Sequence, residues 1–208
     1  MIKAVIFDFD GVIVDSEKIH KQTFMEVLSI DVPENRWYNE FAGTGSRSIF
    51  ERLLQENSMD GDPDELVKKR RELFNQYLGR LEPIAGLRDF LKLLRKKNIK
   101  IAIVSGGHSS YIRPLLEMLG ISEYFDYIVS ADDTKFRKPD PRVFLLASQR
   151  FELRPGECLV IEDSYSGCQG ARDAGMRLVW MRPEKSMNAP ECDFVADDFT
   201  QIPLDLLG

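Results

Sequence analysis

The chain has 208 residues, enough for one full-sized domain and a small second one. With 43% hydrophobic and 30% charged residues it has the composition of an ordinary globular protein, and no apolar run approaches the ~20 residues that span a bilayer. Its net charge of −6 argues against a nucleic-acid partner, because contacts to a phosphate backbone need a basic face, but it is compatible with a small phosphorylated molecule.

The N-terminal sequence MIKAVIFDFD is interrupted by acids at Asp8 and Asp10 and lacks the pattern of a signal peptide. The three cysteines, Cys158, Cys168 and Cys192, have neither zinc-ligand spacing nor the density of a disulfide scaffold, which favours buried reduced thiols. We therefore expect a cytoplasmic protein with no membrane partner. Its oligomeric state is open, with a monomer favoured.

In chain order, the first predicted element is a buried strand at Ile2–Phe7, a short apolar run with β-branched residues. From about Ser16 to Leu81 only helical signals follow. Apolar residues at helical spacing predict helices at Glu17–Leu28 and Ser46–Glu56, and Asp62-Pro63 predicts the start of a third. A helical block inserted directly after the first strand predicts a small second domain.

Beyond this block, helices and strands alternate. Helices are predicted at Ala85–Lys97, at Leu115–Leu119 with its start at Pro114, behind the Asp140-Pro141 cap through Gln149, and at Ser164–Ala174. Strands are predicted at Ile99–Val104, Phe125–Val129, Cys158–Ile161, Arg177–Met181 and Phe194–Ala196. Strands that alternate with helices and are buried on both faces indicate a parallel sheet covered by helices, an α/β, doubly wound fold.

Polar residues follow the predicted strands at the point where each strand ends. Because parallel strands place their carboxyl ends on one edge of the sheet, residues far apart in the sequence are expected to meet there. The polar groups are, in chain order, Asp8-Phe9-Asp10-Gly11, Ser105-Gly106-Gly107, Lys138 and Glu162-Asp163.

The residue types at this edge suit the chemistry of a phosphate group. Carboxylates gathered at one point repel one another, and a shared divalent cation such as Mg²⁺, which prefers oxygen ligands, relieves the repulsion. Ser105 and the amides of Gly106 and Gly107 offer donors to phosphate oxygens. Lys138 offers a positive charge to the nucleophile and the transferred phosphoryl group.

Each of these signals has an ordinary structural alternative when it is taken alone. An acid pair after a strand is often a turn or a helix cap, a single lysine is often a solvated surface residue, and a single serine is often a loop hydroxyl. The specific feature is their joint order: an acid pair, a serine, a lysine and a second acid pair, each at the carboxyl end of a strand.

The segments DFDGVIVDSE, IVSGG, KPDP and IEDSYSG resemble the four motifs of the haloacid dehalogenase superfamily. The resemblance is to the branch with a helical cap inserted after the first motif, which includes β-phosphoglucomutase and phosphoglycolate phosphatase, and it covers essentially the whole chain. It implies an α/β core domain formed by residues 1–15 and 82–208 and a helical cap domain at residues 16–81. It also implies a Mg²⁺-dependent phosphoric monoester hydrolase acting on a small phosphorylated metabolite, such as a sugar phosphate or a phosphoglycolate-like ester.

The resemblance assigns three catalytic residues. It implies that Asp8 attacks phosphorus and becomes an aspartyl phosphate, and that Asp10 protonates the leaving oxygen and then activates water. It implies that Lys138 balances the charge of Asp8 and the phosphoryl group. A dehalogenase of the same superfamily lacks the second acid, so Asp10 argues against carbon–halogen cleavage. A phospho-receiver domain would be much shorter, with its aspartate after an internal strand.

The resemblance also implies the binding residues. Mg²⁺ would be held by the Asp8 carboxylate, the Asp10 backbone carbonyl and Asp163, with Glu162 bound directly or through water. Ser105, Gly106 and Gly107 would hold phosphoryl oxygens.

The helical block decides between a phosphatase and a β-phosphoglucomutase-type mutase. His20 matches a histidine of the mutase, although the alternative for it is an exposed residue on the helix face opposite Phe24. The mutase has an arginine where this chain has Ser46, with Arg47 one step away. Its cap lysine has no clear counterpart, because Gln76 is the nearest match and Arg80 is displaced. Since a mutase needs cap cations for a second phosphate, the lack of clear counterparts to them favours hydrolysis.

The segment from Gly43 to Arg47 is expected to reach the site and to select the substrate. Its alternative is a helix N-terminus with Ser46 as the cap.

Overall fold

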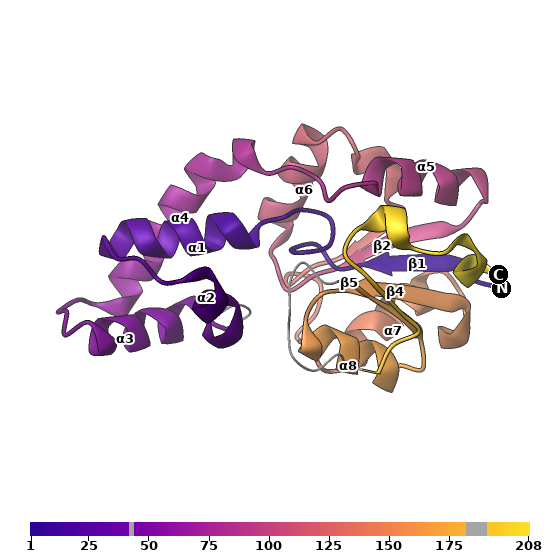
Figure 1. Cartoon of the computed structure of the whole chain (residues 1–208). Helices are drawn as coiled ribbons and strands as arrows, with labels where there is room; N and C mark the ends of the chain where they lie inside the picture. Colours follow the sequence, from indigo (N-terminus) through magenta and orange to yellow (C-terminus); the bar gives the residue numbers. More distant parts are fainter. Residues whose placement is uncertain (42–43, 182–190) are drawn as a thin grey trace. The chain divides into compact units, whose positions relative to one another are not determined.

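The structure, a computed structural model, describes residues 1–41, 44–181 and 191–208, and within this range it omits the side chains of residues 38 and 39. It divides into two compact units (Figure 1). The first unit consists of Met1–Asp15 together with Glu82–Gly208, and the second consists of Ser16–Leu81.

The part of the first unit that the structure describes is built on one six-stranded sheet with the strand order β3-β2-β1-β4-β5-β6, in which every neighbouring pair is parallel. The strands are β1 Ala4–Phe7, β2 Lys100–Val104, β3 Tyr127–Val129, β4 Cys158–Glu162, β5 Arg177–Met181 and β6 Phe194–Ala196. The central strands β1 and β4 are buried along their whole length, because helices cover both faces. The predicted α/β, doubly wound fold is confirmed.

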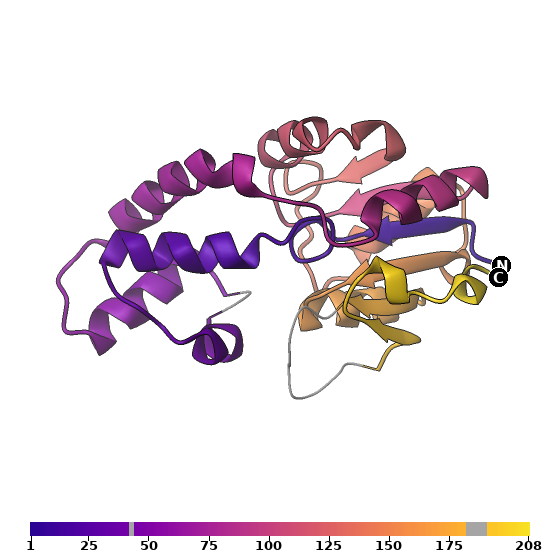
Figure 2. The same cartoon turned by 45° about the horizontal axis from the view of Figure 1, so that its top comes forward.

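Helices α5 and α6 cover one face of the sheet, and helices α7 and α8 cover the other (Figures 1 and 2). Their bounds are α5 Leu87–Lys96, α6 Ser109–Met118, α7 Arg142–Arg150 and α8 Tyr165–Asp173. Under α5, the rings of Phe7, Phe90 and Phe199 pack with centroids 5.4 to 6.2 Å apart. On the opposite face, Phe144 of α7 and Cys168 of α8 are fully buried against strand residues such as Val160.

In the second unit, the described residues form four α-helices, α1 Glu17–Leu28, α2 Glu34–Glu40, α3 Ser46–Glu56 and α4 Pro63–Tyr77. Its core is aromatic: the ring of Phe24 contacts those of Trp37 and Phe50, and all three side chains are at most 2% exposed. Asp62 caps α4 by accepting a hydrogen bond from the Asp64 amide. The bounds of α1 and α3 match the prediction, whereas α2, a short helix after Pro33, was not predicted.

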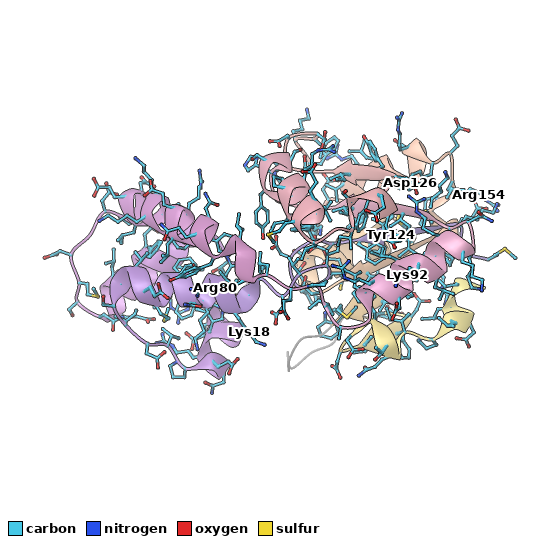
Figure 3. All side chains as sticks on the ribbon, turned by 90° about the horizontal axis from the view of Figure 1, so that it is seen from above. Lys18, Arg80, Lys92, Tyr124, Asp126 and Arg154 are labelled. Atoms are coloured by element: carbon cyan, nitrogen blue, oxygen red, sulfur yellow. The ribbon has the colours of Figure 1, made fainter. Side chains whose placement is uncertain are left out.

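Five 3₁₀ helices complete the described elements: Leu78–Arg80, Ser122–Tyr124, Pro155–Glu157, Phe199–Gln201 and Leu204–Leu207. The 3₁₀ helix Ser122–Tyr124 is followed by Asp126, directly before strand β3, and this residue forms hydrogen bonds to α5 and to β2 (Figure 3). One oxygen of Asp126 accepts from Arg95 of α5 at 2.9 Å, and the other accepts from the Ile101 amide of β2 at 2.9 Å. Among the described residues, none of the helices has the length and apolar character needed to cross a membrane.

The prediction that the second core helix begins at Pro114 is wrong. Helix α6 begins five residues earlier, at Ser109, and Pro114 lies inside it. The Asp132 carboxylate accepts a hydrogen bond from the Ser109 amide at 2.8 Å and so satisfies a donor of the first turn. The buried side chain of Ile112 adds apolar contact on the same turn, and together these offset the hydrogen bond that a proline removes.

Candidate active site

The order of the strands places Asp8 at the centre of the carboxyl edge of the sheet. Strand β1 lies between β2 and β4, and Phe7 is in register with Ile103 and Ile161. Asp8 therefore follows directly after the last paired residue, and its amide donates to the carbonyl of Ile161 at 2.9 Å. The same register brings Glu162 and Asp163, at the end of β4, to one side of Asp8.

A largely enclosed lysine, with a side chain that is 14% exposed, joins the two acidic motifs. Lys138 Nζ donates to Asp8 Oδ1 at 2.5 Å and also to Glu162 Oε1. The Glu162 side chain is fully buried, and its second oxygen, Oε2, accepts from the amide and the hydroxyl of Ser164 at 2.8 and 2.9 Å. Both Glu162 oxygens thus have protein partners, so this carboxylate holds Lys138 in place against Asp8.

The site carries more negative charge than its lysine can balance. Burial and the neighbouring Glu162 raise the pKa of Asp8 from 3.8 to about 7, although Lys138 lowers it. Burial, with the charges of Glu162 and Asp8, also raises the pKa of Asp163 well above its usual value. Burial lowers the pKa of Lys138, but the charges of Asp8 and Glu162 outweigh this effect and raise it overall, so the lysine stays protonated.

The donor set fits a hard divalent cation. One carboxylate oxygen from each of Asp8, Glu162 and Asp163 lies within 4.8 Å of the others, and these oxygens are the ligand type that Mg²⁺ prefers. The backbone of Asp163 is held by the indole of Trp180, which donates to its carbonyl at 3.0 Å. A cation at this point would neutralise the clustered carboxylates, whose mutual repulsion contributes to their raised pKa values.

Two glycines make room for the acidic side chains. A Cβ at Gly11, where φ is +77°, would lie 1.9 Å from Asp163 Oδ2. A Cβ at Gly167, near the start of α8, would lie 1.9 Å from Glu162 Oε1. Neither carboxylate could keep its position beside a larger residue, so both glycines are part of the construction of the site.

We expect Gly167→Ala to lower kcat by roughly 10-fold or more, because the new methyl group displaces Glu162 and with it Lys138. Overpacking a buried position should also cost about 1–3 kcal/mol of unfolding free energy. Steady-state kinetics and thermal unfolding measure the two effects. Gly156→Ala is the matched control, since a Cβ there meets nothing within 4 Å. Full activity in Gly167→Ala would contradict the role of the Glu162–Lys138 pair.

The loop after β2 brings a hydroxyl to the same edge. Ser105 is 8% exposed, and its Oγ accepts a hydrogen bond from the Gly107 amide at 3.0 Å. A hydroxyl that accepts one hydrogen bond can still donate another, which suits it to a phosphoryl oxygen. Ser105 and Gly106 line one cavity together with Lys138. The Gly107 amide already has an acceptor within the loop, so its contact with phosphate stays a prediction.

Asp10 lies beyond the end of β1, in the turn from Phe9 to Val14, and its side chain is half-buried. The structure adds a residue that the sequence did not single out: Tyr111 of α6 donates its hydroxyl to Asp10 Oδ1 at 2.8 Å. These two residues are 101 positions apart, and no spacing in the sequence predicts their contact. The only sequence signal was the position of Tyr111, shortly after the Ser105-Gly106-Gly107 loop.

The helical unit holds a second cluster, around His20. The His20 ring stacks on Phe74 with centroids 4.5 Å apart, and His20 Nδ1 lies 3.0 Å from the guanidinium of Arg70. The alternative of an exposed histidine opposite Phe24 is wrong, because residues four apart share a helix face and His20 is half-buried. Arg70 was not predicted, although its spacing from Leu66 and Phe74 places it on the same face of α4.

The remaining predicted residues of the helical unit are not brought into a site within that unit. Arg47 is exposed on α3 and forms ion pairs with Glu51, at 2.9 Å, and with Asp64. Helix α3 has Gly45 rather than Ser46 as its N-cap. Gly43 lies outside the described residues. The proposed substrate contacts of His20, Arg47 and Gly43 stay predictions.

Comparison with known proteins points to one family. Residues 5–181 match the family described as haloacid dehalogenase-like hydrolase. The chain is 35% identical to fructose-1-phosphate phosphatase YqaB of Escherichia coli over 184 residues, which cover 86% of this chain and 95% of the relative. It is 29% identical to β-phosphoglucomutase of Bacillus subtilis over 216 residues, which cover 99% and 94%.

A solved structure agrees with these sequence matches. A conserved haloacid dehalogenase-like protein of Agrobacterium tumefaciens has a TM-score of 0.81 and 28% identity to this chain. The match covers 95% of this chain and 94% of that protein, and therefore includes both units.

Proposed function

The chain belongs to the haloacid dehalogenase-like hydrolase family, and on that premise we propose that it hydrolyses the phosphate monoester of a small phosphorylated carbohydrate, with Asp8 as the nucleophile. The observation that carries the proposal is Lys138, whose side chain is 14% exposed, bridging Asp8 and Glu162 beside Asp163. A carboxylate that is held by a lysine at the centre of a sheet edge supports a nucleophilic role for Asp8, and the neighbouring acids support a cation site. The enzyme is a phosphoric monoester hydrolase.

In the first step, a carboxylate oxygen of Asp8 forms a bond to phosphorus and the bond from phosphorus to the ester oxygen breaks. Asp10 gives its proton to the departing oxygen, which leaves as an alcohol. Lys138 stays protonated and offsets the charge of Asp8 and the phosphoryl group, and the Ser105 hydroxyl donates to a phosphoryl oxygen. The product of this step is an aspartyl phosphate at position 8.

In the second step, water attacks the phosphorus of the aspartyl phosphate. Asp10, now ionised, takes a proton from the water, and the bond between phosphorus and the Asp8 oxygen breaks. Inorganic phosphate leaves and the Asp8 carboxylate is restored. Asp10 is half-buried and lies two residues after Asp8 in the chain. The hydrogen bonds of Lys138 go to Asp8 and Glu162, and this arrangement is compatible with proton transfer by Asp10 in both steps.

Asp8, Asp163 and the Asp10 carbonyl are the groups that would hold Mg²⁺, with Glu162 beside them. When bound, the ion supplies positive charge to the phosphoryl oxygens as charge develops on them. Glu162 is the least suited of these groups to direct coordination, because Lys138 and Ser164 already bond both of its oxygens.

We expect Mg²⁺ to raise the melting temperature, and to raise it more at pH 8 than at pH 5. Folding raises the pKa of Asp8 from 3.8 to about 7, so protonation of Asp8 stabilises the folded state. This contribution to the free energy of unfolding is fully present below pH 3.8 and is lost as the pH rises through about 7. A cation that binds the ionised carboxylates restores it. At 100 times its Kd, Mg²⁺ would contribute about 2.7 kcal/mol, or roughly 5 to 10 °C for a chain of this size.

Differential scanning fluorimetry with Mg²⁺ or EDTA at both pH values measures this effect without any substrate. Asp163→Asn should lose most of the increase, and Asp205→Asn, at an exposed position, should keep it. An increase of equal size in Asp163→Asn would remove Asp163 from the metal site.

A mutase is the second candidate function, and one observation favours it. Arg70 and His20 place a guanidinium beside an imidazole in the helical unit, and a mutase needs such groups for the second phosphate of its substrate. The relative named β-phosphoglucomutase also matches 99% of the chain.

A screen of phosphorylated metabolites with Mg²⁺ separates the two functions. It should include fructose 1-phosphate, glucose 6-phosphate, β-glucose 1-phosphate and phosphoglycolate, with inorganic phosphate and glucose 6-phosphate as the measured products. A phosphatase releases inorganic phosphate from at least one ester. Conversion of β-glucose 1-phosphate to glucose 6-phosphate without phosphate release would assign the mutase reaction instead.

A further inference from the structure

Tyr111 connects two motifs of the active site. Its hydroxyl donates to Asp10 Oδ1 at 2.8 Å, and Asp10 belongs to the motif after β1. Its ring packs edge-to-face on Phe9, with centroids 5.5 Å apart and an interplanar angle of 81°. The same ring lies against the loop after β2, since a Cβ built on Gly107 would be 3.3 Å from Tyr111 Cδ1.

These contacts fix the tyrosine hydroxyl in space. Phe9 is fully buried, so the ring rests on a rigid surface, and the first turn of α6 is anchored by Asp132 through the Ser109 amide. Two side-chain torsions orient the ring of a tyrosine, and the packing of Tyr111 on Phe9 and Gly107 restricts both of them. The direction of the hydroxyl is therefore set by the packing of the ring and not by the side-chain torsions of Asp10.

We propose that Tyr111 is a positioning residue for Asp10: its hydrogen bond fixes the Asp10 carboxyl group so that the other oxygen, Oδ2, exchanges protons with the leaving group and with water. The inference rests on the proposed acid–base function of Asp10. Proton transfer requires heavy atoms within hydrogen-bond reach and well aligned, and a carboxyl group on a turn can rotate about its side-chain torsions. A hydrogen bond to one oxygen restricts that rotation.

The test is Tyr111→Phe, which keeps the ring and its contact with Phe9 and removes only the hydroxyl. For an alkyl ester such as ethyl phosphate, whose leaving group must be protonated, kcat/KM should fall about 10- to 50-fold, part of the 10²–10⁴ that acid–base catalysis supplies. For p-nitrophenyl phosphate, whose leaving group departs as the anion, kcat/KM should change less than about 3-fold. Its kcat should fall, because hydrolysis of the aspartyl phosphate still needs the base.

Two variants make the result decisive. Tyr124→Phe, on the 3₁₀ helix before β3 (Figure 3), is the matched control and should leave kcat/KM unchanged for both substrates. Asp10→Asn should show the same dependence on the leaving group with a larger effect, and adding Tyr111→Phe to it should cost less than about 2-fold more, since an amide exchanges no proton.

The outcomes distinguish the two levels of the argument. Asp10→Asn with no dependence on the leaving group would contradict the proposed acid–base function itself. If Asp10→Asn shows this dependence while Tyr111→Phe lowers both substrates equally, or neither, only the role of Tyr111 is overturned. If the fold-losses of kcat/KM from the two single substitutions multiplied in the double variant, the role of Tyr111 would also be overturned, because the two residues would then act independently.

Discussion

Asp8→Asn is expected to lower kcat at least about 10³-fold while leaving the fold intact. The amide has nearly the shape of the carboxylate, but it is a poor nucleophile and cannot form the aspartyl phosphate. Asp8 is also the acceptor of the Lys138 hydrogen bond and lies within the carboxylate cluster, so the substitution removes one negative charge from an over-acidic site. Thermal stability in EDTA should therefore be unchanged or higher, which separates a chemical effect from unfolding.

Steady-state kinetics on the best ester from the metabolite screen, together with thermal unfolding, measures this prediction. Asp60→Asn, at an exposed position of the helical unit, is the matched control and should keep the full rate. If Asp8→Asn retained more than a few per cent of kcat, Asp8 would not be the nucleophile.

Lys138→Met is expected to lower kcat about 10²- to 10³-fold, the usual effect of removing one charged donor at a developing charge. Methionine keeps much of the length of the side chain and removes its charge. Asp8 and Glu162 then lose the lysine that both of them contact. Removing one partner of a buried ion pair typically lowers the free energy of unfolding by about 3–5 kcal/mol.

The two effects can be told apart by their response to Mg²⁺. Added Mg²⁺ should recover part of the stability by neutralising the carboxylates, but it should not recover kcat, because the ion does not replace a donor to Asp8 Oδ1. Lys135→Met, three residues earlier and exposed, is the control and should match the wild type. A kcat above about a tenth of the wild-type value in Lys138→Met would show that the lysine is not needed for phosphoryl transfer.

Most of the fold could be predicted from the sequence because most of its elements are specified locally. The strands Arg177–Met181 and Phe194–Ala196 and the helix Glu17–Leu28 have the predicted bounds, since short apolar runs and apolar residues at helical spacing depend on no distant contact. Helix α6 shows where local rules fail: Pro114 favours a helix start, but Asp132 and the buried Ile112 extend the helix back to Ser109.

The gathering of charged groups at the sheet edge could be anticipated for a different reason. Parallel strands bring their carboxyl ends together, so Asp8, Glu162 and Asp163 meet once the strand order is known. The pairing of both Glu162 oxygens and the hydrogen bond from Tyr111 to Asp10 could not be anticipated, because they depend on how side chains pack across elements far apart in the chain.

The covalent intermediate at Asp8 is the central claim, and trapping it is the most direct test. The enzyme is mixed with substrate and Mg²⁺, quenched in acid within the first turnovers, and reduced with borohydride, which converts an aspartyl phosphate to homoserine. Peptide mass spectrometry should find homoserine at position 8 in the wild type, and more of it in Asp10→Asn, where hydrolysis of the intermediate is slower. Homoserine at another aspartate, or none at position 8 in both proteins during active turnover, would contradict nucleophilic attack by Asp8.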